Sequence, residues 1–307
     1  EWKKDRRAVL RERFDAVPQF GDITEVTGAD ILNATHTRPG LLVGGFPCQD
    51  TSIAAPHRAG LDGKRSGAFY EFTRLVDELA ALTDALTPRW VVIENTPGLL
   101  TSGPPGGRGR DMERVVHTLA DLGYGWAYRV VDAASLGGGQ RRQRVLVLGH
   151  RGGDPLPAGQ VLGLTGDSGE DSRLDHPRRS PARGPRAARS AEEHGGRRLI
   201  RKSRRPRSKD DFATYIPDDY LNTLNGFDTG WGGRQTNVLI DQGRLRFLTL
   251  EEWEMAQGFE PGWTESMGSD GKRFQALGDS MSVHHARWLG ENLAAVDASL
   301  PMIGAHA

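Results

Sequence analysis

Short apolar runs alternate with amphipathic segments along the first half of the chain, and this alternation constrains the fold more than any other feature. The runs at 41–45 and 90–93 are short and apolar throughout, which predicts two buried strands. Over 66–86 the apolar residues recur every three or four positions, which predicts an amphipathic helix with Ser66 as N-cap. A second helix is expected over 111–122.

Two further strands, expected at 126–132 and 144–149, continue the alternation. This order of elements predicts an α/β protein with a parallel or mixed sheet and helices on both faces. In such sheets the chemically active residues lie beyond the carboxyl ends of the strands. Cys48 and Glu94 follow successive strands, so we expect the thiol and the carboxyl group on the same rim.

The alternation is absent from 151 to 243. Large apolar residues are sparse over 151–210, which predicts a loop-like stretch, whereas aromatic and aliphatic residues over 211–240 predict a small module. Between Arg173 and Lys209 the chain carries fourteen Lys and Arg residues but three acidic ones. This basic block is consistent with phosphate binding and equally with a solvated, flexible loop.

Helical signals resume in the last quarter of the chain. Thr249 and Glu252 have the spacing of a capping box, and Gly258 is placed to end the helix. A final helix is expected over 282–296.

The chain contains one cysteine, Cys48. One cysteine excludes an internal disulfide, a Cys-rich zinc site and a CxxC redox pair, and we expect no metal site. Its side chain is either a small buried apolar group or a reactive thiolate. The formal net charge of +0 excludes a uniformly basic chain, and no apolar run approaches the roughly 20 residues of a membrane helix.

The segment GGFPCQDTS at 44–52 resembles the catalytic Pro-Cys loop of the DNA cytosine-5 methyltransferases of bacterial or phage restriction-modification type. Further blocks resemble this family in the same order. They are Glu94-Asn95 with Gly98, Gln140 with Arg142 and Arg144, Arg246 with Thr249 and Glu252, and Gly278-Asp279-Ser280. The resemblance implies a Rossmann-like S-adenosylmethionine-dependent methyltransferase sheet with a small irregular target-recognition domain.

The resemblance also implies a domain organisation. Residues 1–150 correspond to the catalytic domain and 151–243 to the target-recognition region, within which 166–210 is expected to be flexible and basic. Residues 244–307 return to the catalytic domain. The family opens with a Phe-x-Gly-x-Gly strand and turn that should precede Glu1, and we expect that it was cut off or is supplied by a separate chain.

The implied catalytic residues are Cys48, Glu94, Arg142 and Arg144. A thiolate that adds to C6 of cytosine makes C5 nucleophilic, and a carboxyl group that shares a proton with N3 assists this addition. Arg142 and Arg144 alternate along one predicted strand, so both project from one side, where a guanidinium suits the cytosine carbonyl or a phosphate. An exposed basic strand end and a strand-end acid paired with arginine are the simpler alternatives.

The resemblance further implies binding residues. For S-adenosylmethionine these are Glu1, Trp2, Asp22, Ile23, Pro47, Ser280 and Met281. For DNA they are Gln49, Ser52, Gln140 and Arg234, although Gln49 and Ser52 also suit an ordinary surface loop. A duplex hides C5 and C6, so the target cytosine has to turn out of the stack.

The partners follow from the same resemblance. We expect a cytoplasmic monomer in a bacterial or phage-infected cell that binds double-stranded DNA and no membrane, with a cognate restriction endonuclease as an open possibility. Two alternatives also remain open: an RNA cytosine-5 methyltransferase, and a non-catalytic DNA-binding remnant that lacks the glycine-rich strand. A cysteine hydrolase is disfavoured, because the histidines lie in no supporting pattern.

Overall fold

The computed structural model describes residues 1–37, 39–46, 67–82, 87–103, 107–164, 198–204, 214–224 and 237–301. The helices are α1 (Lys4–Arg13), α2 (Gly28–Thr35), α3 (Ala68–Leu82), α4 (Arg110–Asp121), α5 (Leu156–Val161), α7 (Leu250–Ala256), α8 (Asp270–Asp279) and α9 (Val283–Ser299). Short 3₁₀ turns are η1 (Ile23–Glu25), η4 (Pro97–Thr101), η5 (Ala133–Leu136) and η6 (Glu265–Met267). The strands are β1 (Leu41–Gly45), β2 (Trp90–Asn95), β3 (Tyr124–Asp132), β4 (Gln140–Arg141), β5 (Gln143–Arg151), β6 (Arg198–Arg204), β7 (Thr214–Pro217), β8 (Leu221–Asn222), β9 (Asn237–Asp241) and β10 (Arg244–Arg246).

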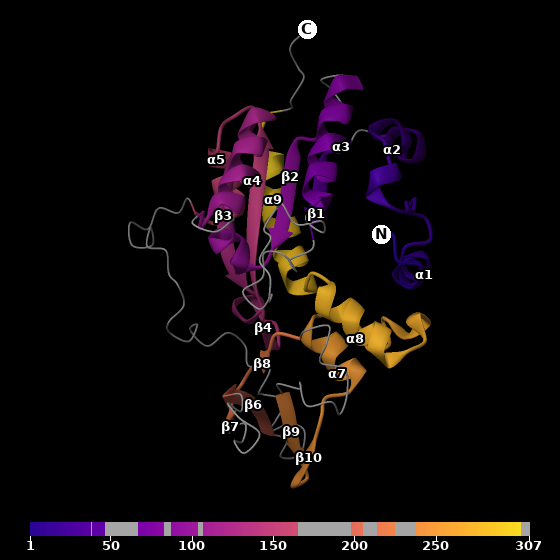
Figure 1. Cartoon of the computed structure of the whole chain (residues 1–307), viewed down its shortest axis with the longest axis vertical. Helices are drawn as coiled ribbons and strands as arrows, with labels where there is room; N and C mark the ends of the chain where they lie inside the picture. Colours follow the sequence, from indigo (N-terminus) through magenta and orange to yellow (C-terminus); the bar gives the residue numbers. More distant parts are fainter. Residues whose placement is uncertain are drawn as a thin grey trace.

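The main sheet contains four strands in the order β1-β2-β5-β3 (Figure 1). β1 and β2 run parallel with Gly45 opposite Glu94, whereas β5 runs antiparallel to both β2 and β3. All four predicted strands of this half are confirmed, and the sheet is mixed, which is one of the two arrangements expected. The carboxyl ends of β1 and β2 therefore lie at one rim, where β5 begins.

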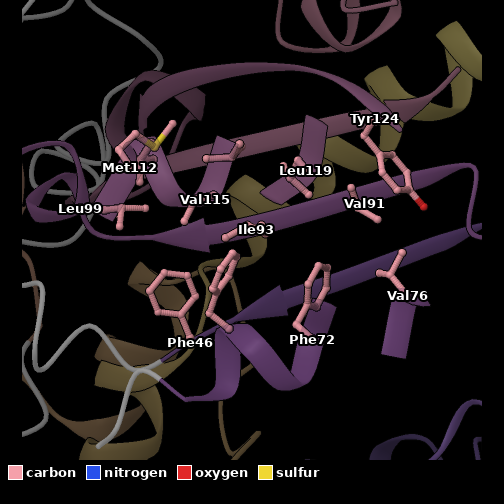
Figure 2. Packing of buried hydrophobic residues seen from close by; sticks show 13 residues of the cluster. Phe46, Phe72, Val76, Val91, Ile93, Leu99, Met112, Val115, Leu119 and Tyr124 are labelled. Carbon is pink, nitrogen blue, oxygen red and sulfur yellow. The ribbon is translucent and has the colours of Figure 1, made fainter. Parts of the chain in front are cut away.

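Helices cover both faces of this sheet. On one face, α3 and α4 pack against Val91 and Ile93 of β2 (Figure 2). On the other face, α5 and α9 pack against Trp90 and Val92. Because successive side chains of a strand point to opposite sides, a strand that is buried on both faces is apolar throughout. This explains why WVVI carries no polar residue.

The predicted helices are confirmed with small shifts at their ends. α3 lies within the predicted range 66–86, and its expected N-cap, Ser66, lies outside the described residues. α4 matches its predicted range to within one residue. Thr249 and Glu252 form both hydrogen bonds of the capping box at α7, and Ser282 caps α9 by accepting from the backbone N–H of His284.

The stretch 151–210, which was expected to be loop-like, contains α5 and β6. α5 packs against β3, and Ala158, Val161 and Leu162 lie in the core that α9 covers. A helix was not expected here, because Pro157 and Gly159 lie within the six residues of α5. The core of the main sheet thus continues beyond residue 150, where the domain boundary was expected.

A second sheet has the order β10-β9-β6-β7 and lies at the far end of the molecule from α3 (Figure 1). The short parallel pair β4-β8 joins it to the main sheet. Leu221 and Leu224 pack with Leu250 and Trp253 of α7 and Phe274 of α8 in a core of their own. Among the helices of the described ranges, none has the length and apolar character that a membrane crossing needs.

Candidate active site

The rim where β2 ends carries an ion pair. Glu94 is the last residue but one of β2, and Arg144 is the second residue of β5. Nε of Arg144 lies 2.6 Å from Oε1 of Glu94. Their side chains are 10% and 18% exposed respectively, so water screens the pair only weakly. A guanidinium and a carboxylate at this distance form a charge-assisted hydrogen bond that orients both groups.

The carboxylate of Glu94 packs closely against Gly45, the last residue of β1, where a side chain would fill the space that the carboxylate occupies. A Cβ atom at Gly45 would lie 3.0 Å from Oε2 of Glu94, which is closer than side chains normally pack. Beside it, Nδ2 of buried Asn95 donates to the carbonyl of Phe46 at 3.2 Å, and Oδ1 accepts from the backbone N–H of Thr96. These contacts hold the chain that leaves β1 against the end of β2.

The predicted nucleophile follows directly after this point. Pro47, Cys48, Gln49 and Ser52 lie outside the described residues, as does Arg234. The proximity of Cys48 to Glu94 therefore stays a prediction. The nearest described residue, Phe46, is buried and bonded to the residue that follows Glu94.

The structure gives Arg142 a structural position in place of the substrate contact that was expected. Its side chain is fully buried, and Nη2 donates to the carbonyls of Gly278 at 2.9 Å and Ser280 at 2.5 Å. Nη1 lies 3.5 Å from the carbonyl of Leu224. Carbonyls at the end of α8 have no partner within the helix, and a cation is favourable there. Because the guanidinium is enclosed by main chain, it cannot meet a base or a phosphate without giving up these bonds.

Gln140 also differs from its predicted role as a DNA contact. Its side chain is fully buried, and Oε1 accepts from the backbone N–H of Leu224 at 3.3 Å. Close by, Oγ1 of Thr223 donates to the carbonyl of Arg141. Gln140 thus fixes the strand β8 and the residues after it to the end of the main sheet, and it is not accessible to a nucleic acid in this structure.

Two of the predicted cofactor blocks meet at α1. The carboxylate of Glu1 lies 3.8 Å from Nη1 of Arg6, and Nη2 of Arg6 also pairs with the carboxylate of Asp279. Asp279 ends α8 and precedes Ser280 and Met281, both of which are predicted cofactor residues. Arg6 therefore links the first residue of the chain to the block that contains Ser280.

The predicted cofactor residues Asp22 and Ile23 lie near the same helix. A Cβ atom at the preceding residue, Gly21, would lie 3.5 Å from Nη1 of Arg7, which places the start of this stretch beside α1. Asp22 is exposed and begins η1, and the carbonyl of Ile23 accepts from Nη2 of Arg74 at 2.9 Å. The structure therefore brings together blocks that the sequence separates widely.

The chemistry of these residues fits the adenosyl part of S-adenosylmethionine. Glu1 and Asp22 are exposed carboxyl groups, which can accept from a ribose diol or an exocyclic amine. Hydrogen bonds from Thr24 hold the pKa of Asp22 below its usual value, so this group is a carboxylate at neutral pH. Trp2 is 65% exposed and offers an aromatic surface on which a base can stack.

The sequence analysis missed one buried residue near the rim, His285. It is fully buried in the first turn of α9, and its Nε2–H donates to the carbonyl of Val131 at 3.0 Å. The one available signal was a histidine at a core-facing position of the last helix, where an apolar residue is usual. A single histidine without a repeating pattern predicts no contact.

The family of this chain follows from comparison with known proteins. A family profile described as C-5 cytosine-specific DNA methylase matches residues 1–164. The Type II methyltransferase M2.BsuMI of Bacillus subtilis (strain 168) is 29% identical over 309 residues, which cover 96% of this chain and 68% of that protein. The Type II methyltransferase M.Sau3AI of Staphylococcus aureus is 36% identical over 161 residues, which cover 49% of this chain and 36% of that protein.

Solved structures show the same fold at lower sequence identity. The Entamoeba histolytica methyltransferase EhMeth is 17% identical with a TM-score of 0.61, and the match covers 98% of this chain and 89% of that one. The Dnmt2 methyltransferase of S. pombe is 16% identical with a TM-score of 0.57, and the match covers 96% of this chain and 89% of that one. The mixed sheet with helices on both faces is thus the fold that these methyltransferases share.

Proposed function

Since the chain belongs to the C-5 cytosine-specific DNA methylase family, we propose that Cys48, Glu94 and Arg144 carry out its reaction. That reaction is methylation of cytosine in DNA at C5, and bound S-adenosylmethionine supplies the electrophilic methyl group. The observation that carries the proposal is the Glu94–Arg144 ion pair, which lies at the rim where β1 leads toward Cys48.

The proposed nucleophile is the thiolate of Cys48. It adds to C6 of cytosine, and the electron pair that reaches C5 would then form the bond to the methyl carbon of bound S-adenosylmethionine while the bond from that carbon to the sulfonium sulfur breaks, so that the sulfur leaves as a neutral thioether. Loss of the C5 proton and departure of the thiolate restore the ring, so the cysteine is regenerated. Two residues of chain span at most about 7 Å, and this short reach from Phe46 supports the assignment of Cys48 to this rim.

The proposed role of Glu94 is to bind N3 of the cytosine and share a proton with it while the thiolate adds to C6. This neutralises the charge that develops on the ring. Nε and Nη1 of Arg144 already bond to Glu94 and to the carbonyl of Gln143. A guanidinium carries five N–H donors, so the remaining ones suit the cytosine carbonyl.

The catalytic residues can reach C5 and C6 only if the cytosine turns out of the duplex toward Glu94 and Arg144. Gln49, Ser52 and Arg234 are the proposed DNA contacts. The basic block adds phosphate contacts whose strength falls with salt concentration. Within this block, Arg201 of β6 is paired with Asp218.

The setting we propose is that of a Type II methyltransferase, as M2.BsuMI and M.Sau3AI are named. The chain would act as a monomer in the bacterial cytoplasm, and its partner would be a cognate restriction endonuclease that cleaves the same unmethylated sequence.

Covalent trapping tests the proposal. Genomic duplex DNA that contains 5-fluorocytosine is incubated with the protein and S-adenosylmethionine, because fluorine at C5 blocks release of the adduct. We expect a protein–DNA species that survives denaturation and is absent for Cys48→Ser. Persistence of the adduct in Cys48→Ser would exclude Cys48 as the nucleophile. A methyl label that enters transfer RNA but not DNA would favour an RNA substrate.

A further inference from the structure

Residues 278–285, which run from the end of α8 into the first turn of α9, pack against the main chain around Arg144. From this segment, Nε2–H of His285 donates to the carbonyl of Val131 at 3.0 Å. Val131 lies directly opposite Arg144 in the β3-β5 pairing. His285 thus fastens α9 to the backbone position that faces Arg144 across the sheet.

A second attachment reaches the same segment from the other direction. Arg142, two residues before Arg144, donates to the carbonyls of Gly278 and Ser280. Its own backbone N–H donates to Oδ1 of Asp132 at 2.9 Å, which ties it to the end of β3 as well. One attachment therefore lies two residues before Arg144, and the other lies on the neighbouring strand β3.

Close packing keeps the segment from shifting. A Cβ atom at Gly138 would lie 3.0 Å from Cδ2 of His284, and one at Gly258 would lie 3.0 Å from its Nε2. His284 therefore fills a space that two glycines leave open. The segment 278–285 has little room to move relative to η5 or to the end of α7.

The charges around His285 require a neutral ring. Arg142 and Arg144 act on it electrostatically, with Asp132 as the opposing charge. Burial lowers its pKa to about 4, so the imidazole is uncharged at neutral pH and donates from Nε2 without repelling the two guanidinium groups. A protonated histidine at this position would repel the guanidinium groups of Arg142 and Arg144.

We infer that Arg142 and His285 are positioning residues that together hold the guanidinium of Arg144 against Glu94. Neither touches the substrate; each acts through the main chain that carries or faces Arg144. The inference rests on the role proposed above for Glu94 and Arg144. Without the two attachments, the start of β5 would be held by strand pairing and by the bond from the Arg142 backbone to Asp132, and the long arginine side chain would sample other rotamers.

The test measures the Arg144–Glu94 bond directly. The Nε–H resonance of Arg144, assigned by its loss in Arg144→Lys, is followed by hydrogen exchange in the 15N-labelled chain. We expect exchange about tenfold faster in His285→Ala and in Arg142→Lys. His285→Gln should remain near wild type, because a glutamine amide can still donate to the carbonyl of Val131. Leu289→Ala, in the core under the same helix, is the matched control for lost stability.

Kinetics then separates this inference from the function on which it rests. In DNA methylation by the same proteins, we expect kcat to fall about tenfold in His285→Ala with KM for DNA unchanged. Wild-type protein that methylates no DNA refutes the proposed function, whereas the exchange result still decides whether Arg142 and His285 position Arg144. Wild-type exchange at Arg144 in both variants, or equally fast exchange in Leu289→Ala, overturns the inference.

Discussion

Nε of Arg144 lies 2.6 Å from Oε1 of Glu94, and this bond joins two strands that run in opposite directions. Glu94 lies opposite Leu146, so Arg144 reaches the carboxylate diagonally from the start of β5. The pair lies at the carboxyl end of β2. Ligands usually bind beyond this end of the strands in α/β sheets. An acid and a guanidinium that the sequence separates by a whole helix and strand thus become one polar group.

Removal of the carboxyl group should reduce catalysis more than stability. In Glu94→Gln the side chain keeps its shape but cannot share a proton with N3 in the same way. We expect kcat to fall about 10²- to 10⁴-fold with little change in the melting temperature. Steady-state methylation and thermal unfolding measure the two effects. A variant with kcat within a factor of three of wild type would exclude the role proposed for Glu94.

The space at Gly45 is predicted to be necessary for the orientation of Glu94. In Gly45→Ala the new methyl group meets Oε2 of Glu94 at 3.0 Å and pushes the carboxylate from its place. We expect kcat to fall at least about tenfold, since small displacements of catalytic groups are costly. Gly40→Ala, just before the same strand, meets no atom within 4 Å and serves as the control. Equal activity of the two variants would contradict the prediction.

The buried histidine predicts a loss of stability in acid. In the unfolded chain, His285 has its ordinary pKa of 6.5, and in the folded chain burial lowers this pKa to about 4. Between these pH values the unfolded state binds a proton that the folded state does not. The free energy of unfolding therefore falls as the pH falls from 6.5 to about 4, by on the order of 3 kcal/mol.

Chemical denaturation at several pH values checks this effect. His285→Gln cannot titrate, so it should lack this part of the slope. His117→Gln removes a histidine whose side chain is 72% exposed and should keep the slope of wild type. A slope that is the same in all three proteins would show that His285 does not contribute.

The buried carboxylate of Glu254, in α7, is predicted to be essential for stability. Glu254 is fully buried and accepts from the backbone N–H groups of Gly262 at 2.6 Å and Thr264 at 2.9 Å, and from Nη2 of Arg273 at 3.2 Å. Burial acts to raise its pKa, but a bond from the hydroxyl of Thr264, together with these bonds, holds the pKa below the usual value, so the negative charge is present in the folded protein. Glu254→Gln places an N–H group among these donors and leaves Arg273 with the longer ion pair to the exposed carboxylate of Glu251, at 3.8 Å.

We expect Glu254→Gln to lower the free energy of unfolding by about 3 kcal/mol, because breaking a buried ion pair from one side strands the other charge. Glu251→Gln, at an exposed position of the same helix, should cost at most about 1 kcal/mol. Urea unfolding of both variants measures the difference. Equal losses of unfolding free energy in the two variants would contradict the prediction that the buried bonds of Glu254 stabilise the fold.

Local patterns predicted the secondary structure well where they were strong. The run WVVI and the spacing of apolar residues over 111–122 each matched an element to within two residues, because strand and helix periodicities depend on neighbouring residues alone. The pattern was weak at α5, where proline and glycine obscured it. The helix forms there because its apolar side chains are buried under α9, and that contact is made by residues far along the chain.

The sequence by itself determined the order of strands and helices, the helix caps at Thr249 and Ser282, and the rim position of Glu94. Each depends on contacts within a few residues or on the geometry of parallel strands. Only the tertiary structure decided that Arg144 meets Glu94, whereas Arg142, two residues away, binds the end of α8. The two arginines are alike in sequence, and their roles differ because the carbonyls of Gly278 and Ser280 reach one of them and not the other.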